Sequence, residues 1–258
     1  MTAATGYFQP GDSWLHRRHP FTKLVGLGFV LISAFLLPSI VLAILFAAVV
    51  AIAAAAGIGR SLLRAMRIPA VLLISIVVVN ALFYPGAIDR LLTIGPFSVT
   101  REGLTFGLTS AARLLVAFVS SVTFLFTTLA DDLLEALIAR GASHKIAFIV
   151  LAAVQMVPRL QSRTGAILDA QQSRGLAITG SIRQRVRALV PLIGPVILGS
   201  LIDVRERTFA LEARGFGAGK ARTAYRVVAD PPVDRVIRPS LLLGTVAVIV
   251  LAVTGTWR

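Results

Sequence analysis

The sequence has few of the residues that build soluble metal centres and redox sites. It has no cysteine and three histidines, and only 15% of its 258 residues are charged. The absence of cysteine excludes disulfide bonds and thiolate metal ligands, and three histidines argue against a histidine-rich metal site. Ordinary soluble domains carry about 25% charged residues, so this composition does not belong to that class.

Apolar residues dominate instead. They make up 56% of the chain, and mean hydropathy is +0.84. A soluble protein of this length cannot bury so much apolar surface, so lipid is part of the solvent of this chain. The net charge is +14, and 16 of the 26 basic residues lie between residues 131 and 238. One basic, polar region is thus set into a very apolar chain.

Five apolar runs approach the length of about 20 residues that crosses the hydrocarbon core of a bilayer. They cover residues 21–37, 40–58, 68–84, 104–130 and 239–253. Pro38 and Ser39 predict a tight helical hairpin between the first two runs, and the prolines and glycines of residues 85–96 predict a loop between the third and the fourth. The pattern predicts an all-α polytopic membrane protein with about five transmembrane helices.

Basic residues in the loops predict the orientation, because short cytoplasmic loops are enriched in lysine and arginine. Residues 17–23 and 60–67 carry three such residues each, which predicts a cytoplasmic N-terminus. The predicted organisation has four parts: a cytoplasmic N-terminal segment (1–20), transmembrane helices one to four (21–130), a cytoplasmic coupling region (131–238) and the last transmembrane helix (239–258).

The coupling region contains two weaker apolar runs, residues 146–157 and 188–202. Both are shorter than the usual spanning length. If both crossed the membrane, Arg183, Arg185 and Arg187 would lie outside, against the charge bias. We therefore expect helices that are buried in protein or lie at the interface, and an arrangement with up to seven spans stays open.

Two segments of the coupling region end in the same way. A long amphipathic helix, predicted to start at Pro158 because proline suits a first turn, ends at Ser173-Arg174-Gly175. A second, starting near Pro195, ends at Ala213-Arg214-Gly215. Glycine after the last helical residue takes the left-handed conformation that stops a helix, and arginine there complements the helix dipole.

Each of these ends presents a guanidinium that can form two parallel hydrogen bonds with a carboxylate on a partner. Two such ends favour a scaffold that docks two copies of one partner. Arg-Gly at a helix end is also common capping chemistry. A third instance, Ala139-Arg140-Gly141, ends the short predicted helix 131–139, and we interpret it as a plain C-cap.

The order of these segments resembles the transmembrane T component of energy-coupling factor (ECF) transporters, the CbiQ/EcfT type. The resemblance covers most of the chain. It is carried by residues 13–24, Arg101–Leu104 with Ala112-Arg113-Leu114, residues 128–137, Val157–Leu160 and the two Arg-Gly signatures. The signatures of the family read Ala-Arg-Gly, and the first one here departs from that pattern only at Ser173.

The resemblance implies a non-catalytic subunit of an ATP-driven importer of a vitamin or a transition-metal ion, in the plasma membrane of a prokaryote. In that family the two signature arginines dock in grooves of two ATP-binding-cassette (ABC) ATPase subunits, alike or different. A small membrane substrate-binding subunit, the S component, is the other partner and recognises the substrate, so this sequence does not name it. The implied ATPase-docking residues are Ser173, Arg174, Gly175, Ala213, Arg214 and Gly215.

No catalytic, metal or cofactor site is predicted. Residues 215–220 are glycine-rich, but they follow a helix and lack the spacing of a phosphate-binding loop, so we expect a flexible helix exit. His16 and His19 flank two arginines and are interpreted as an interfacial cap, and Asp131 and Asp132 as acids that complement a helix dipole. Few aromatic residues interleave with the arginines, so nucleic-acid binding is not expected.

Two polar residues fall inside predicted spans. Arg113 either snorkels to the interface or lines a protein interface, and Asn80 either pairs between helices or touches the substrate-binding subunit. The alternative function from another class is a membrane enzyme acting on an anionic lipid or a polyprenyl phosphate. Its headgroup would lie on the basic region, and acids or histidines would have to converge nearby.

Overall fold

The computed structural model describes residues 8–85, 89–94, 97–176, 181–216 and 229–255. These residues form nine helices and two short strands, which confirms the all-α prediction. The chain divides into two compact units. We call residues 1–141 together with 228–258 the membrane unit, and residues 142–227 the α7–α8 unit.

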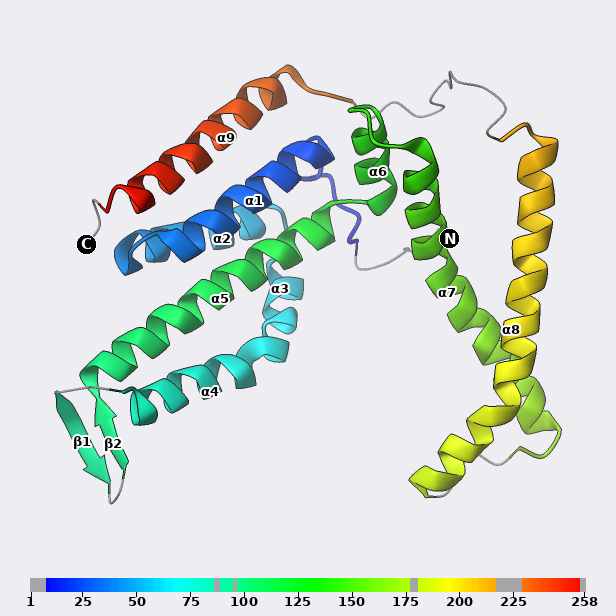
Figure 1. The fold of residues 1–258 in the computed structure, drawn as a ribbon, viewed down its shortest axis with the longest axis horizontal. Helices are drawn as coiled ribbons and strands as arrows, with labels where there is room; N and C mark the ends of the chain where they lie inside the picture. Colours follow the sequence, from blue (N-terminus) through cyan, green and yellow to red (C-terminus); the bar gives the residue numbers. More distant parts are fainter. Residues whose placement is uncertain (1–7, 86–88, 95–96, 177–180, 217–228, 256–258) are drawn as a thin grey trace. The chain divides into compact units, whose positions relative to one another are not determined.

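The membrane unit contains seven helices and a small hairpin of strands (Figure 1). Its elements are α1 (Pro20–Leu36), α2 (Ser39–Ala55), α3 (Gly59–Ala65), α4 (Arg67–Phe83), β1 (Arg90–Ile94), β2 (Phe97–Thr100), α5 (Arg101–Thr127), α6 (Ala130–Ile138) and α9 (Pro232–Val253). Only Leu37 and Pro38 separate α1 from α2, so the predicted helical hairpin is confirmed. The segment predicted as a loop contains β1 and β2, which pair antiparallel with Thr93 opposite Ser98.

Two helices of the described residues, α5 and α9, are long and apolar enough to cross a bilayer. A third span results if α3 and α4, which are bent by 53° at their junction, count as one. Helices α1 and α2 are apolar but only 17 residues long, near the short limit for a spanning helix. These segments match the five predicted runs, and the count of five spans stays a prediction because it includes the two short helices.

The core of the membrane unit lies where α1, α2 and α5 meet. Ala34 of α1, Leu42 of α2 and Val116 of α5 are almost completely buried against one another. A second cluster joins Ala53 of α2 to Val119 of α5. Because the long helix α5 contributes to both clusters, it is the central helix of this unit.

Helices α4 and α5 approach each other so closely that glycine is required at the contact. A Cβ atom added to Gly103 would lie 2.3 Å from the backbone oxygen of Asn80, and one added to Gly107 would lie 3.1 Å from Cα of Val77. Asn80 itself donates from Nδ2 to the carbonyl of Ile76 in its own helix, at 2.8 Å. The described residues thus show its amide bonded within α4 and not to another helix, and a contact with the substrate-binding subunit stays a prediction.

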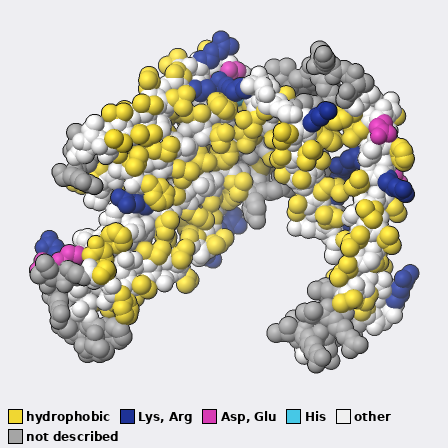
Figure 2. Space-filling view, viewed as in Figure 1, with side chains coloured by type: hydrophobic (Ala, Val, Ile, Leu, Met, Phe, Trp, Pro, Cys, Tyr) yellow, Lys and Arg dark blue, Asp and Glu magenta, His cyan; other side chains and the backbone are white. Residues whose placement is uncertain are grey.

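Apolar side chains cover the outside of the membrane unit. Figure 2 shows hydrophobic side chains over most of the visible face of α1, α5 and α9. Ile68 at the start of α4 is 79% exposed and Val253 at the end of α9 is 81% exposed. Soluble proteins rarely leave such contiguous apolar surface in water, so lipid or a membrane partner covers these helices.

The α7–α8 unit contains two long helices, α7 (His144–Ser173) and α8 (Ile182–Ala213). The predicted starts at Pro158 and near Pro195 are wrong, because both prolines lie inside longer helices. An interior proline removes one backbone hydrogen bond and kinks a helix, but the apolar runs before each proline continue the helical pattern. Helices α7 and α8 are long enough to span but are not among the candidate spans of the described residues, and the choice between five and seven spans stays open. The side chains of Arg183, Arg185 and Arg187 lie outside the described ones.

Candidate functional site

The C-terminus of α7 is closed by a glycine-based capping motif. Gly175 has φ of +92°, in the left-handed region that favours glycine. The backbone N–H of Leu176 donates to the carbonyl of Gln171 at 3.0 Å, and that of Gly175 to the carbonyl of Gln172 at 2.9 Å. These two backbone hydrogen bonds form the Schellman motif. The motif leaves Arg174 at the tip of the helix.

The C-terminus of α8 repeats the same geometry. Gly215 has φ of +70°, and the N–H of Phe216 donates to the carbonyl of Leu211 at 2.9 Å. Both Arg174 and Arg214 are exposed. Within the described part of the chain, neither guanidinium has a hydrogen-bond or ion-pair partner. The two ends therefore present equivalent arginines whose donors are available to another molecule.

An ion pair joins α7 and α8 at equivalent positions. Arg163 donates from its two terminal nitrogens to the two carboxylate oxygens of Asp203, at 2.6 and 3.0 Å. Gly199 makes room for this pair, since a Cβ atom there would lie 3.0 Å from the guanidinium of Arg163. Arg163 and Asp203 are forty residues apart, as are Arg174 and Arg214. Each partner of the ion pair thus lies ten residues before the end of its own helix.

The two helices cross in opposite directions. The start of α7 lies near the end of α8, where the rings of Phe148 and Phe216 are 4.8 Å apart. The tips Arg174 and Arg214 consequently lie at opposite ends of the crossed pair (Figure 1). With a rise of 1.5 Å per residue, ten residues on either side of the crossing separate the tips by about 30 Å along the pair.

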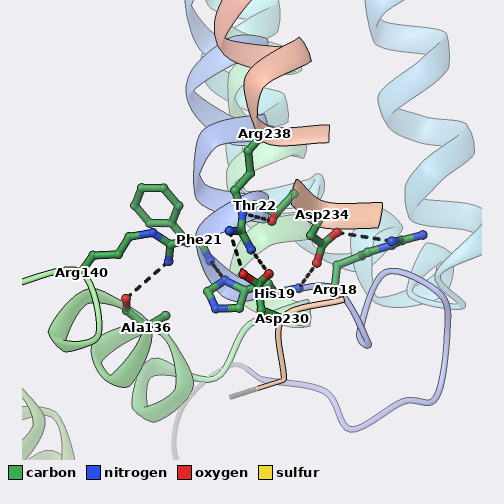
Figure 3. Close-up of polar contacts among 9 residues, drawn as sticks. All are labelled: Arg18, His19, Phe21, Thr22, Ala136, Arg140, Asp230, Asp234 and Arg238. Carbon is green, nitrogen blue, oxygen red and sulfur yellow. Dashed lines mark hydrogen bonds and ion pairs between the residues drawn. The ribbon is translucent and has the colours of Figure 1, made fainter. Parts of the chain in front are cut away.

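The third Arg-Gly end differs from these two in its surroundings. Gly141 after α6 has φ of +96°, so the cap prediction is confirmed. The guanidinium of Arg140, however, lies 3.9 Å from the ring centroid of Phe21 in α1 (Figure 3). Arg140 also donates to the carbonyl of Ala136 at 3.5 Å. A cation over an aromatic face is attracted by the ring quadrupole, so Arg140 fastens α6 to α1.

The start of α9 is fastened to the same turn of α1. Asp234 is fully buried and accepts a hydrogen bond from the backbone N–H of His19 at 2.8 Å and from Arg18 at 3.3 Å. Arg238 forms an ion pair with Asp230 and donates from Nε to the hydroxyl of Thr22 at 2.7 Å. Figure 3 shows these side chains gathered around the start of α1.

The chain passes twice between its two units, after Gly141 and before Val228. Arg140 anchors the first passage to Phe21, and Asp230, Asp234 and Arg238 anchor the second to residues 18–22. Both connections of the α7–α8 unit are therefore held at the first turn of α1. We call this group of residues the anchor cluster.

His19 is the N-cap of α1, a helix-capping role that the sequence analysis did not assign. Its Nδ1 accepts a hydrogen bond from the backbone N–H of Phe21 at 3.2 Å. Burial lowers the pKa of His19, and the nearby Arg238 lowers it further. The pKa of Asp230 is also lowered, chiefly by the hydrogen bond from Arg238. The ring of His19 is therefore held neutral, with a lone pair free to cap the helix.

The other candidate residues of the sequence analysis, His16, Asp131 and Asp132, have structural roles. His16 bonds Ser13 at 2.6 Å and the carbonyl of Gln9 at 3.1 Å, and Asp131 and Asp132 lie in the first turn of α6 as predicted. The described residues contain no group of three or more histidine or acidic side chains that would hold a metal ion. The predicted flexible exit at residues 217–220 lies outside the described residues.

Comparison with known proteins identifies the family to which these segments belong. Residues 11–225 match the CbiQ family, described as cobalt transport protein. The chain belongs to the CbiQ family, the T components of ECF transporters. The match covers the anchor cluster up to Arg140 and both Arg-Gly tips.

Several curated relatives agree with this placement. The energy-coupling factor transporter transmembrane protein EcfT of Heliobacterium modesticaldum is 32% identical over 233 residues, 86% of each chain. EcfT of Leuconostoc gelidum subsp. gasicomitatum is 30% identical over 264 residues, 98% of this chain and 97% of the relative. This CbiQ protein is a membrane component of an ABC-type transport system, and the relatives named as transmembrane proteins fit a non-catalytic subunit.

One relative is much longer than this chain. A Bifidobacterium longum protein whose name describes an ABC transporter ATP-binding protein is 30% identical over 253 residues. The match takes up 94% of the present chain but 32% of that relative. This CbiQ chain thus spans about a third of the length of that relative.

Sequence reasoning did not find the anchor cluster. Asp230, Asp234 and Arg238 are spaced four residues apart just before an apolar run. This spacing puts the three side chains on one face of a helix, and it is the signal in the sequence that could have indicated the cluster. The partner residues 18–22 lie more than two hundred positions away. No local pattern pairs residues so distant, because the contact exists only after α1 and α9 pack together.

Proposed function

We propose that this chain is the energy-coupling subunit of an ECF-type importer of a vitamin or a transition-metal ion. Arg174 and Arg214 dock into two ABC-type ATPase subunits on the cytoplasmic side. ATP-driven movement of these subunits displaces α7 and α8, and the membrane unit passes the displacement to a membrane substrate-binding subunit. In this proposal the N-terminus and residues 131–238 lie in the cytoplasm, and the remaining helices lie in the plasma membrane of a prokaryote.

The observation that carries the proposal is the equivalence of the two helix tips. Each tip has a Schellman motif, a left-handed glycine and an exposed arginine without a partner among the described residues. The tips lie at opposite ends of a crossed pair held together by Arg163 and Asp203. A monomer with two equivalent, separated tips is suited to bind two similar subunits, one at each tip.

The chemistry of the tips favours an acidic groove as their receptor. A guanidinium binds a carboxylate through two parallel hydrogen bonds, and such charge-assisted bonds are stronger than neutral ones. An apolar residue, Leu176 or Phe216, follows each glycine and is half-buried beside the helix tip. The Bifidobacterium longum relative combines a region similar to this chain with a name that describes an ATP-binding protein, which supports ABC ATPases as the partners.

The anchor cluster supplies a path for the displacement. The two connections of the α7–α8 unit are both held at residues 18–22. A pull on either connection therefore acts first on the start of α1, where α9 is also attached. Helices α1 and α9 are neighbours along their length, so they form the first part of the membrane unit to respond.

Charge reversal at the tips tests the docking role. We expect Arg174→Glu or Arg214→Glu to lower co-purification of the ATPase subunits about tenfold, and the double variant at least 100-fold, the factors for losing one and two charge-assisted hydrogen bonds. Arg205→Glu is the matched control, because Arg205 is exposed on α8 but lies away from the tip. Wild-type retention of the ATPases by the double variant would overturn the docking role.

The predicted orientation has a separate test. Because the chain contains no cysteine, a single cysteine at position 172 or 212 is the only site for a thiol reagent. We expect both positions to react with a membrane-impermeant reagent in inverted vesicles and not in intact cells. Labelling from outside the cell at either position would contradict the proposal.

The alternative function, a membrane enzyme acting on an anionic lipid or polyprenyl phosphate, lacks a supporting observation. His16 and His19 are occupied in structural hydrogen bonds, and the acids of the anchor cluster are paired with arginines. Acid–base catalysis needs a group that is free to exchange a proton with the substrate. The described residues do not gather such groups around a cavity.

A further inference from the structure

Arg113 occupies the middle of a spanning helix. It is the thirteenth of the 27 residues of α5, the helix that meets both the length and the hydropathy of a span. With a rise of 1.5 Å per residue, Arg113 lies about 18 Å from the outer end of α5 and about 21 Å from the inner end. The hydrocarbon core is about 30 Å thick, so in a spanning α5 Arg113 lies inside the hydrocarbon, away from both ends of the helix.

The side chain of Arg113 is partly buried, and the described residues give it no hydrogen-bond or ion-pair partner. Its Nε is buried without a hydrogen-bond acceptor, and within the part of the chain that the structure describes Arg113 forms no ion pair. A guanidinium is charged at every physiological pH. Snorkelling can carry the terminal nitrogens toward an interface, but it leaves the buried Nε without an acceptor among the described residues.

A charged side chain at this depth is costly unless another group meets it. The face of α5 around Arg113 is open to such a group. Phe106, two turns away on the same face, is 49% exposed, and the small residues Ser110 and Ala117 lie one turn on either side of Arg113. Small residues allow another transmembrane helix to approach closely.

We propose that Arg113 is a docking point inside the membrane for a carboxylate carried by a transmembrane helix of the substrate-binding subunit. The proposal rests on the proposed function, which supplies a membrane partner, and it adds the chemistry by which that partner is recognised. A carboxylate is the complement of a guanidinium in geometry and charge. Pairing neutralises both groups, so each subunit presents a polar residue that is costly in lipid and satisfied only in the complex.

This arrangement separates the two partners of the chain. The ATPases meet the tips of α7 and α8, and the substrate-binding subunit meets α5. Arg113 is a recognition residue, because it touches the partner and not a reacting group. Its neutral variant loses no hydrogen bond within the described chain, so it is expected to fold and insert as the wild type does.

The test uses the full complex, purified by a tag on the substrate-binding subunit after co-expression with the ATPases. We expect Arg113→Gln to lower the amount of this chain retained by about tenfold or more, the factor for losing a charge-assisted hydrogen bond. Arg113→Lys keeps the charge and is expected to retain an intermediate amount. Arg101→Gln, at the exposed outer end of the same helix, is the matched control and is expected to behave as the wild type.

A second measurement does not depend on affinity. A photoreactive amino acid at position 117, one turn from an intact Arg113, is expected to cross-link to a transmembrane helix of the substrate-binding subunit, close to an aspartate or glutamate. Wild-type retention of Arg113→Gln overturns the proposal, as does cross-linking only to lipid or to a second copy of this chain. The two proposals fail separately, because loss of ATPase binding is read from Arg174 and Arg214 in a pull-down that leaves position 113 unchanged.

Discussion

The end of α6 and the ends of α7 and α8 are built from the same three residue types and differ in what surrounds them. Gly141, Gly175 and Gly215 all have positive φ, so the backbone is capped alike. All three arginines are exposed, but Arg140 lies over the ring of Phe21, whereas the guanidiniums of Arg174 and Arg214 have no partner among the described residues. An Arg-Gly end is therefore a local device for stopping a helix, and its further role depends on what packs against the arginine.

The comparison separates a fixed region from a free one. The anchor cluster holds its charged groups in paired contacts, with Asp234 fully buried, and at the two tips the arginines have no partner among the described residues. Substitutions in the fixed region should lower stability, and the matching substitutions at the tips should lower partner binding instead. The predictions below test this division, beginning with the largest effect.

Asp234→Ala should destabilise the protein most. The change leaves the partly buried Arg18 without its carboxylate and the N–H of His19 without its acceptor, and breaking a buried ion pair costs about 3 kcal/mol or more. The measurement is thermal unfolding in detergent. Asp169→Ala, at an exposed position of α7, is the control and should change stability by less than about 0.5 kcal/mol. Equal effects would show that the anchor cluster is not a fixed region.

Charge reversal should act differently at Arg140 and Arg174. Arg140→Glu removes the cation from the face of Phe21 and places a carboxylate there, which should lower the free energy of unfolding by about 1–2 kcal/mol. Arg174→Glu should leave it within about 0.5 kcal/mol, because the guanidinium of Arg174 has no partner among the described residues. Both values come from the same unfolding measurement. A larger loss for Arg174→Glu than for Arg140→Glu would reverse the assignment of fixed and free ends.

Alanine at the three capping glycines should have the same effect on stability at each site. Gly141→Ala, Gly175→Ala and Gly215→Ala each force a Cβ atom into the left-handed region, at a cost of about 1 kcal/mol. No atom lies within 4 Å of the added Cβ at Gly141 or Gly175, so the backbone alone determines the cost at these two positions. Unequal losses would show that the three caps differ in more than the surroundings of the arginine.

The pH dependence should be the smallest effect and should belong to the fixed region. The pKa of His19 is lowered in the folded protein, so folding favours the neutral ring. Its contribution to stability is complete above the pKa of the unfolded chain, about 6.5, and is lost as the pH falls below that value. His19→Asn keeps a capping side chain and should flatten the unfolding temperature between pH 8 and pH 5.5. An unchanged slope in this variant would exclude His19 as its source.

The sequence predicted a structural feature correctly where a short stretch of residues is enough to determine that feature. The hairpin at Pro38 and the glycine stops at 141, 175 and 215 depend on a few neighbouring residues, and each was predicted. It failed at Pro158 and Pro195, where the rule for a first-turn proline competed with a longer helical pattern that continues through both. The close approach at Gly103 was not predicted, because glycine in a span has several uses and the backbone of α4 is its cause here.

The sequence by itself determined that the chain is helical and that lipid surrounds much of it. It also determined that most of the positive charge lies in one region and that three helices end with Arg-Gly. Apolar length, charge bias and capping chemistry act over one helix or less, so they can be read directly from the residues. The tertiary structure alone decided that Arg140 is held against Phe21 while Arg174 and Arg214 are free, and that Asp234 is buried against residues 18 and 19. These outcomes depend on contacts between segments more than one hundred positions apart, which form only when the helices pack.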